Sequence, residues 1–329
     1  MLLINASEIR KLLPMNCAID CVEAAFAATT AGDTNTPLRT RINAEDGTFL
    51  FMPTYSPKAG AAALKTISIY PYNAEKGLPT APATVQVIDG DTGIPLALMD
   101  GDALTRLRTG ASTGAAMRHL ANPSSRIAVL VGTGGQAATQ ALAMITALPE
   151  LTELRIVNPI YEDAERFASE LQLPAGFGGK ITTWDNADEA AKDADVITLV
   201  TSSTKPVLSA RNLKPGVTIS CVGSYQPHMQ ECGSDIIARA DLIVCDHVES
   251  ALAESGDLII PIDEGVIDRS QVITELGGVI SGQQTGRTSG EQVIVYETVG
   301  VAAQDLWAAQ EVLTQAQRAG VGTNWDPTA

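Results

Sequence analysis

A glycine-rich turn near the middle of the chain could bind a phosphate group. The stretch AVLVGTGGQAATQAL, residues 128–142, is typical of a buried strand, a G-x-G-x-x-A turn and a helix start. Gly132 allows the tight turn, Gly134 lets the backbone approach a pyrophosphate, and Ala137 permits close packing of helix on strand. The phosphates would lie at the positive helix N-terminus. The pattern predicts a dinucleotide site, with a purely structural glycine turn as the alternative.

The end of the next strand indicates which dinucleotide is expected. The strand LRIV is followed by Asn158, so no Asp or Glu stands ready to bind both ribose hydroxyls. No arginine is adjacent to meet a 2′-phosphate, and the following segment is acidic, with Glu162 and Asp163. Only Arg166 could reach such a phosphate. This favours NAD(H) and leaves NADP(H) open.

The charge balance limits the class of partner. The chain has 329 residues and a formal net charge of −16. Such a surface repels nucleic acid and anionic membranes, so neither is expected as a partner. An anionic ligand would have to be bound by a few well-placed cations. Lysines and arginines inside apolar or glycine-rich segments are therefore candidates for a binding site.

Cysteine and histidine usage predicts no metal site. The five cysteines are Cys17, Cys21, Cys221, Cys232 and Cys245. They show no CxxC or Cys/His spacing, so buried thiols are expected. The N-terminus lacks the pattern of a signal peptide, and no run of about 18 apolar residues is present. These features are typical of a protein of the reducing cytoplasm.

The pattern of elements predicts an α/β protein. Residues 5–33 indicate two helices, and residues 40–100 alternate like the strands of an antiparallel sheet. Residues 102–121 form a helix of small residues. From Arg126 onward, short apolar strands alternate with helices, as in a doubly wound parallel sheet of the Rossmann type. A long amphipathic helix follows, and the tail VGTNWDPTA is expected to be irregular.

The break at NPSS, residues 122–125, indicates a domain boundary. If the last helix returns to the first domain, that α+β domain is discontinuous. We therefore expect one domain from residues 1–121 and 301–329, and a dinucleotide-binding domain from residues 122–300.

Several segments outside the glycine turn carry a family resemblance. They include GLPT, DGDTGIPLALMDGDALTRLRTGAS and GRTSGEQVIVYETVGVAAQDL. In order and spacing the chain resembles the ornithine cyclodeaminase/μ-crystallin family from about residue 30 to 310. The resemblance implies a homodimer, with an antiparallel barrel-like sheet in the substrate and dimerisation domain. It also implies hydride transfer between a nicotinamide and the α-carbon of an amino acid or imine.

The same resemblance assigns roles to individual residues. Arg39 and Lys65 match positions that bind the substrate carboxylate, and Arg108 matches an arginine that reaches both substrate and cofactor. Lys65 and Arg108 are the expected catalytic residues, and Arg41 is the alternative to Arg39. Cations in strand and Gly/Ala contexts of an acidic chain suit a carboxylate site. Without the resemblance each would be read as a solvated surface cation.

Further positions match the family's cofactor and substrate contacts. The expected cofactor-binding residues are Thr80, Arg108, Gly132, Gly134, Gly135, Gln136, Asn158, Thr201, Val222, Gly223, Ser224 and Thr298. The expected further substrate-binding residues are Tyr225 and Val299. The alternative is that these are ordinary turn glycines and strand residues.

Two departures from the family pattern predict the subtype. Tyr225 stands where ornithine cyclodeaminases have a catalytic aspartate, and Leu50 stands where a glutamate is expected. Without these carboxylates, a second amino group on the substrate has no acceptor. We therefore expect a substrate that is already cyclic, a five- or six-membered ketimine carboxylate reduced to L-proline or L-pipecolate.

The proton donor and the alternatives stay open at this point. Lys65 could donate if burial and Arg108 lower its pKa, and Tyr225 or His228 could assist. The alternative activities are an alanine-type dehydrogenase and an ornithine cyclodeaminase. A non-catalytic binding protein like μ-crystallin is a third reading, against which the presence of Lys65 and Arg108 argues.

Overall fold

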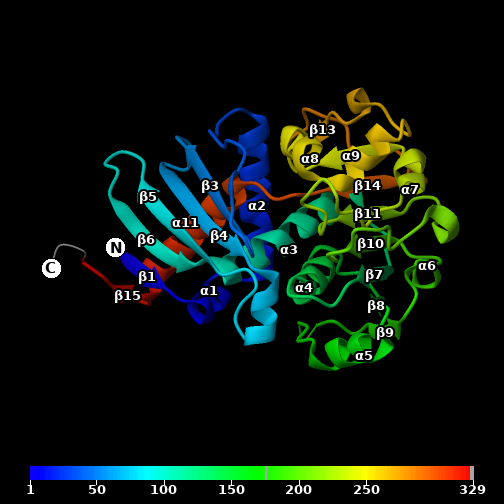
Figure 1. The fold of residues 1–329 in the computed structure, drawn as a ribbon, viewed down its shortest axis with the longest axis horizontal. Coiled ribbons are helices and arrows are strands. Elements are labelled where there is room, and N and C mark those ends of the chain that lie inside the picture. Colours follow the sequence, from blue (N-terminus) through cyan, green and yellow to red (C-terminus); the bar gives the residue numbers. More distant parts are fainter. Residues whose placement is uncertain (175, 327–329) are drawn as a thin grey trace. The chain divides into compact units, whose positions relative to one another are not determined.

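The computed structural model of the chain describes residues 1–174 and 176–326 and forms two compact units (Figure 1). Unit 1 comprises Met1–Arg108 and Val301–Ala329, and unit 2 comprises Thr109–Gly300. The division falls inside helix α3 (Gly101–Leu120), whereas the sequence placed it after residue 121. Small residues explain this: a Cβ on Gly101 would lie 2.6 Å from the Ala83 carbonyl carbon, and one on Gly110 would lie 2.6 Å from the Thr139 oxygen. The helix therefore packs closely within unit 1 at its start and within unit 2 further along.

Unit 1 contains a seven-stranded sheet in the order β15-β1-β6-β5-β4-β3-β2. Its strands are β1 (Leu2–Ile4), β2 (Thr40–Asn43), β3 (Thr48–Ser56), β4 (Ala61–Ile69), β5 (Ala83–Asp89), β6 (Pro95–Asp100) and β15 (Thr323–Asn324). The strands β2 to β6 are antiparallel neighbours, as predicted. The prediction of an irregular tail was wrong at Thr323–Asn324, which pairs with β1. A strand of two residues is too short to show an alternation of apolar and polar side chains in the sequence. It is recognised only by its pairing with β1 in the structure.

Helices cover one face of this sheet. They are α1 (Ala6–Leu12), α2 (Met15–Thr30) and α11 (Ala302–Ala319). The 3-10 helix η1 (Pro71–Lys76) lies in the connection between β4 and β5. Helix α11 packs against α2 and against β3, β4 and β5. Alternate strand residues such as Met52, Val85 and Met99 are buried on that face. The intervening residues on the other face, such as Phe51 and Leu64, remain half-buried.

Unit 2 contains an eight-stranded parallel sheet in the order β13-β12-β14-β11-β10-β7-β8-β9. Its strands are β7 (Ile127–Val131), β8 (Glu153–Val157), β9 (Lys180–Trp184), β10 (Val196–Leu199), β11 (Thr218–Cys221), β12 (Leu242–Cys245), β13 (Thr274–Glu275) and β14 (Ile294–Glu297). The strand order reverses between β7 and β10, which is where open α/β sheets bind ligands at their carboxyl ends. The predicted Rossmann-type fold is confirmed.

Helices lie on both faces of the parallel sheet. They are α4 (Ala137–Ala147), α5 (Tyr161–Glu170), α6 (Ala187–Ala190), α7 (Ser234–Arg239), α8 (Val248–Glu254), α9 (Gly256–Asp263) and α10 (Leu276–Ile280), with the 3-10 helices η2 (Ala210–Asn212) and η3 (Arg269–Gln271). Two separate apolar clusters result. Val129 and Ile197 belong to one, while Leu130 and Met144 belong to the other. This two-sided burial explains the continuous apolar runs in the sequence.

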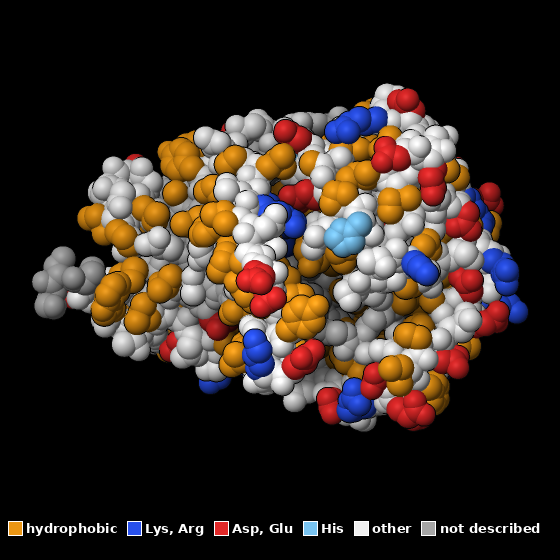
Figure 2. Space-filling model, in the orientation of Figure 1, with side chains coloured by type: hydrophobic (Ala, Val, Ile, Leu, Met, Phe, Trp, Pro, Cys, Tyr) orange, Lys and Arg blue, Asp and Glu red, His pale blue; other side chains and the backbone are white. Residues whose placement is uncertain are grey.

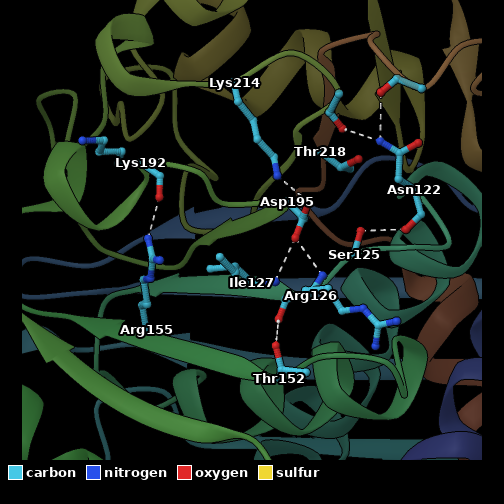
Figure 3. Close-up of polar contacts among 12 residues, drawn as sticks. Asn122, Ser125, Arg126, Ile127, Thr152, Arg155, Lys192, Asp195, Lys214 and Thr218 are labelled. Atoms are coloured by element: carbon cyan, nitrogen blue, oxygen red, sulfur yellow. Dashed lines mark hydrogen bonds and ion pairs between the residues drawn. The ribbon is translucent and has the colours of Figure 1, made fainter.

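The amino ends of the central strands are held by a polar network (Figure 3). The Asp195 carboxylate accepts the backbone N–H groups of Arg126 and Ile127 at 2.7 and 2.8 Å and pairs with Lys214 Nζ at 2.6 Å. Burial acts to raise the pKa of Asp195, but these donors outweigh it and hold the pKa below its ordinary value. The network thus fixes the start of β7 beside β10, at the opposite end of the strands from the glycine turn.

Most charged side chains are exposed, and acidic ones predominate. Exposed cations pair locally, as Arg106 does with Asp102 and Arg166 with Asp163. Among residues 1–174 and 176–326, Lys65 and Arg108 are the only buried lysine and arginine. No single helix in those ranges is long and apolar enough to cross a membrane; α1 and α2 pass that test only as a pair bent by 86°.

Candidate functional site

Lys65 lies in the interior of unit 1, paired with the first turn of α11. It is in the middle of β4, opposite Met52 of β3 and Val85 of β5, so its side chain points to the helix-covered face. Its Nζ lies 2.7 Å from Asp305 Oδ2, and both side chains are only 1% exposed. A buried cation of this kind requires a partner, and Asp305 provides it.

Arg108 completes the same cluster. Its Nε donates to Asp305 Oδ1 at 3.1 Å, and its Nη1 donates to Gln304 Oε1 at 3.2 Å. Gln304 Oε1 also accepts the Val301 N–H at 2.9 Å, while Gln304 Nε2 is buried and has no hydrogen-bond partner among the described residues. Two cations therefore share one carboxylate, with an amide donor beside them. Such a cluster is suited to bind an anionic group.

The shared carboxylate and the burial change the proton affinity of Lys65. Burial and the charge of Arg108 lower its pKa to about 7, although Asp305 acts in the opposite direction. Burial acts to raise the pKa of Asp305, but the charges of Lys65 and Arg108 outweigh it and hold that pKa below its ordinary value. The sequence allowed Lys65 to be a proton donor only if burial and Arg108 lowered its pKa, and both act in that direction. A lysine in this range can give up a proton near neutral pH.

The other unit 1 candidates lie closer to solvent. Arg39 precedes β2 and is half-buried, and its charge contributes to the lowered pKa of Lys65. Arg41 is an exposed residue of β2. This proximity favours Arg39 over Arg41 as the third cation. Thr80 is exposed in the loop between β4 and β5, where its carbonyl accepts the Tyr70 N–H at 2.8 Å.

In unit 2 the glycine turn has the geometry of a phosphate site. Gly132 has φ +106°, and a Cβ there would lie 2.6 Å from the Val200 carbonyl oxygen, so only glycine fits. Gly134 and Gly135 are exposed, and a Cβ on Gly134 would meet no atom within 4 Å. Gln136 precedes α4 without capping it, and its Oε1 is buried with no hydrogen-bond partner among residues 1–174 and 176–326. The open turn and the uncapped helix therefore fit a pyrophosphate.

Asn158 follows β8 and contacts the glycine turn. Its Nδ2 donates to Thr133 Oγ1 at 2.6 Å, and its Oδ1 accepts the Ile160 N–H at 2.9 Å. Arg166, the cation considered for a 2′-phosphate, forms an ion pair with Asp163 at 2.6 Å. The arrangement is consistent with a cofactor that lacks this phosphate.

A buried carboxylate joins the loops after β10 and β11. Glu231 is fully buried, and its two oxygens accept the backbone N–H groups of Thr201 and Gly223. Burial and the charge of Asp257 raise its pKa to about 8. Val222 and Ser224 flank Gly223 and are buried. The predicted cofactor residues on these two loops thus lie around a carboxylate that the sequence did not reveal.

Thr298 and Val299 follow β14 and are buried. Asp246 Oδ2 accepts a hydrogen bond from Thr298 Oγ1 and another from the Gly300 N–H, each at 2.7 Å. In the loop after β11, Tyr225 is half-buried and His228 is exposed. The segment after β14 is therefore firmly held, whereas His228 faces solvent.

One further group of buried side chains with possible metal-ligand atoms was not expected from the sequence. Ligand-type atoms of Cys221, Asp257 and Glu297 lie within 4.8 Å of one another. Burial raises the pKa of Asp257 to about 7 and that of Glu297 well above its ordinary value. The Cys221 pKa is also raised well above normal, first through its hydrogen bond with Cys232 and then by burial. These groups consequently keep their protons to a higher pH than they would in water, which for Asp257 is about 7.

Three residues of these clusters were not predicted from the sequence: Gln304, Asp305 and Glu231. The first two stand in the motif AAQDL, where an acidic residue in the first turn of a helix is ordinarily read as a favourable charge at the helix N-terminus. A pair of polar residues, one of them charged, inside an otherwise apolar helix start was the available signal. Glu231 stands in HMQECGSD, which reads as an exposed loop.

Comparison with known proteins connects these arrangements to a family. The model of the ornithine cyclodeaminase/mu-crystallin family matches residues 1–320. The Delta(1)-pyrroline-2-carboxylate reductase of Bacillus cereus is 38% identical over 324 residues, which are 98% of each chain.

Two solved structures share the fold over nearly the whole chain. One is Thermococcus litoralis Delta(1)-pyrroline-2-carboxylate reductase in complex with NADH and L-proline, with TM-score 0.93, 35% identity and coverage of 99% and 100% of the two chains. The other is an archaeal alanine dehydrogenase dimer with bound NAD, with TM-score 0.92, 31% identity and 99% of both chains covered. Both similar structures therefore contain a nicotinamide dinucleotide.

Proposed function

The chain belongs to the ornithine cyclodeaminase/mu-crystallin family, and we propose that it uses NADH to reduce the C=N bond of a cyclic ketimine carboxylate. The proposed substrate is Δ1-pyrroline-2-carboxylate and the product L-proline; the six-membered homologue would give L-pipecolate. The observation that carries the proposal is the buried cluster of Lys65, Arg108 and Asp305. Its relatives' activity supports the choice of substrate.

In this proposal unit 1 binds and protonates the substrate. Arg108, Arg39 and the free amide donor of Gln304 would hold the carboxylate through charge-assisted hydrogen bonds. Lys65 would give a proton from Nζ to the imine nitrogen, which leaves a neutral amine. Its pKa of about 7 makes this transfer feasible near neutral pH. Asp305 would keep both cations in place.

Unit 2 would bind the cofactor. The glycine turn and the N-terminus of α4 would hold the pyrophosphate, Asn158 a ribose, and the loops carrying Thr201 and Gly223 the nicotinamide half. NADH, when bound, supplies the hydride that reduces the imine carbon. In residues 159–174, which follow Asn158, the one basic residue is Arg166, and its ion pair with Asp163 supports NADH over NADPH.

Leu50 and Tyr225 stand where cyclisation of a diamino acid would use two carboxylates. One side chain is apolar and the other is a phenol. Leu50 is buried in β3, and Tyr225 follows β11. This supports reduction of an existing ring over ornithine cyclodeaminase activity. Alanine dehydrogenase remains the second candidate function, because an archaeal alanine dehydrogenase shares the fold at TM-score 0.92.

Substrate oxidation and reduction assays test the proposal. We expect NADH consumption with Δ1-pyrroline-2-carboxylate, much slower consumption with pyruvate plus ammonia, and no proline from ornithine. NADPH should be a poorer donor than NADH by about tenfold or more, because a 2′-phosphate would meet the like charges of Glu162 and Asp163. Consumption with pyruvate plus ammonia but none with the cyclic imine would assign the second candidate instead.

A homodimer through unit 1 is the accompanying proposal. The strand face away from α11 carries half-buried or exposed apolar residues, among them Phe51, Tyr55, Leu64, Ile88 and Leu98. Figure 2 shows hydrophobic side chains gathered over the strands of this unit. A contiguous apolar face of this kind is typical of a protein interface.

Light scattering can test the dimer. The native chain should have twice the mass of one chain, and Leu64→Glu should give a monomer, because a charge would be buried without a partner. Ile160→Glu is the matched control, since Ile160 is an apolar residue of unit 2 that is 56% exposed. A Leu64→Glu protein that stays dimeric would place the interface elsewhere.

A further inference from the structure

We propose that Glu231 is a positioning residue that fixes the spacing of the two cofactor loops after β10 and β11, and that proton uptake by its carboxyl weakens NADH binding. The inference rests on the proposed function, because it takes these loops as part of the NADH site. Glu231 itself is buried and is not proposed to touch the cofactor.

The geometry places one carboxylate between two neighbouring loops. Strands β10 and β11 run parallel with Leu199 opposite Cys221, so Thr201 and Gly223 both come two residues after the ends of their strands. Glu231 Oε1 accepts the Thr201 N–H, and Oε2 accepts the Gly223 N–H. Each loop is thus held by its own oxygen of the same group.

Close packing makes this arrangement sensitive to small changes. A Cβ on Gly223 would collide with the Thr201 carbonyl oxygen and with Glu231 Oε2. On the other side, the Val200 carbonyl oxygen packs against Gly132 of the phosphate turn. The loop that Glu231 holds therefore adjoins the turn expected to bind the pyrophosphate, so a displacement of the loop would reach the cofactor.

The segment that carries Glu231 is itself anchored. Asp257 Oδ1 accepts the backbone N–H groups of Glu231 and Cys232 at 2.7 and 3.0 Å, and the Glu231 carbonyl accepts the Val207 N–H at 2.8 Å. Asp257 Oδ2 is buried without a hydrogen-bond partner among the described residues. Asp257 therefore contributes one oxygen to the backbone and an unneutralised charge to its surroundings.

The surroundings of Glu231 are acidic. Asp257 of α9 raises its pKa through its charge, Glu297 of β14 and Cys232 interact with it electrostatically, and Cys221 lies in the same cluster. Burial, first, and then the charge of Asp257 raise the pKa of Glu231 to about 8, although its hydrogen bonds from Thr201 and Gly223 act in the opposite direction. A protonated carboxyl has one oxygen that donates, so it cannot accept both N–H groups equally well. Ionisation restores both acceptors, and NADH binding should tighten as the pH rises through about 8.

The test is the dissociation constant of NADH, measured by its fluorescence across about pH 6 to 10 with the whole chain. For the native protein, NADH should bind more tightly at the alkaline end. Glu231→Gln offers one acceptor and one donor, so its dissociation constant should be about tenfold higher at alkaline pH, the value of one hydrogen bond to a charged acceptor. It should also lose the pH dependence. Glu249→Gln, at an exposed glutamate of α8, is the matched control and should match the native protein.

Asp257→Asn keeps the oxygen that accepts the two backbone N–H groups and removes only the charge. The midpoint of the pH dependence should move to lower pH by about one unit, because a like charge no longer opposes ionisation of Glu231. Affinities for Glu231→Gln equal to the native values at every pH would overturn the inference, as would an unmoved midpoint in Asp257→Asn. If the native protein binds no NADH at all, the proposed function itself fails.

Discussion

Replacing Lys65 with methionine should lower kcat/KM for Δ1-pyrroline-2-carboxylate by about a thousandfold or more. Methionine fills a similar volume but can neither donate a proton nor carry charge, and general acid catalysis alone contributes about a hundredfold to ten-thousandfold. The affinity for NADH should stay within about twofold, because Lys65 is not among the residues expected to hold the cofactor, most of which lie in the other compact unit. Steady-state kinetics and NADH titration give both quantities.

The pH profile supplies the control for Lys65. Its pKa of about 7 means that the protonated form is lost as pH rises through neutrality. For the native enzyme, kcat should therefore fall by up to about tenfold per pH unit above the apparent pKa. Lys65→Arg keeps the charge but titrates far higher, so KM should change little while kcat falls and this limb disappears. If Lys65→Met lost a thousandfold in kcat/KM but kcat of the native enzyme did not fall above neutral pH, the proton would come from another donor.

Replacing Asp305 with alanine should lower the free energy of unfolding by about 3–5 kcal/mol, because two buried cations lose their only shared carboxylate. Lys65 and Arg108 both pair with Asp305, at 2.7 and 3.1 Å. Urea unfolding monitored by circular dichroism measures the change. The pKa of Lys65 should also fall further, so any residual activity should decline at a lower pH than in the native enzyme.

A double replacement separates the charge effect from simple loss of packing. Lys65→Met combined with Asp305→Ala removes one of the two buried cations that Asp305→Ala leaves unpaired. The double variant should therefore have a free energy of unfolding at least about 1 kcal/mol higher than Asp305→Ala alone. A fully additive pair would show that Lys65 and Asp305 are not coupled. A single Asp305→Ala protein as stable as the native chain would show that the cluster is not needed for folding.

Some of the site could be predicted because its signals are local. Gly132 stands between an apolar strand and a helix start, and that order alone identified the turn. Lys65 was a candidate because it is a cation inside an apolar strand of a chain with net charge −16, but only the family resemblance distinguished it from a solvated surface cation. These signals can be read from the sequence because the residues next to Gly132 and Lys65 along the chain already differ from those around a typical surface residue.

Asp305 and Glu231 had no such local signal. Acidic residues are common in this chain, with 38 Asp and Glu against 22 Lys and Arg, and most lie at the surface. Their importance comes from partners far away in sequence: Lys65 and Arg108 for Asp305, Thr201 and Gly223 for Glu231. Burial of a carboxylate becomes visible only when the chain has folded around it.

The amino-acid sequence by itself determined the two kinds of sheet and the glycine turn, and the family resemblance identified Leu50 and Tyr225 as departures from the cyclodeaminase pattern. Periodicity and glycine positions act over a few residues, so they can be read directly. Only the tertiary structure decided which acids face which cations and N–H groups, that α3 belongs to both compact units, and that Thr323–Asn324 extends the first sheet. These features depend on which segments meet in the folded chain. Electrostatic and packing energies are set by the distance between two groups in space and by their burial, and not by their separation along the chain.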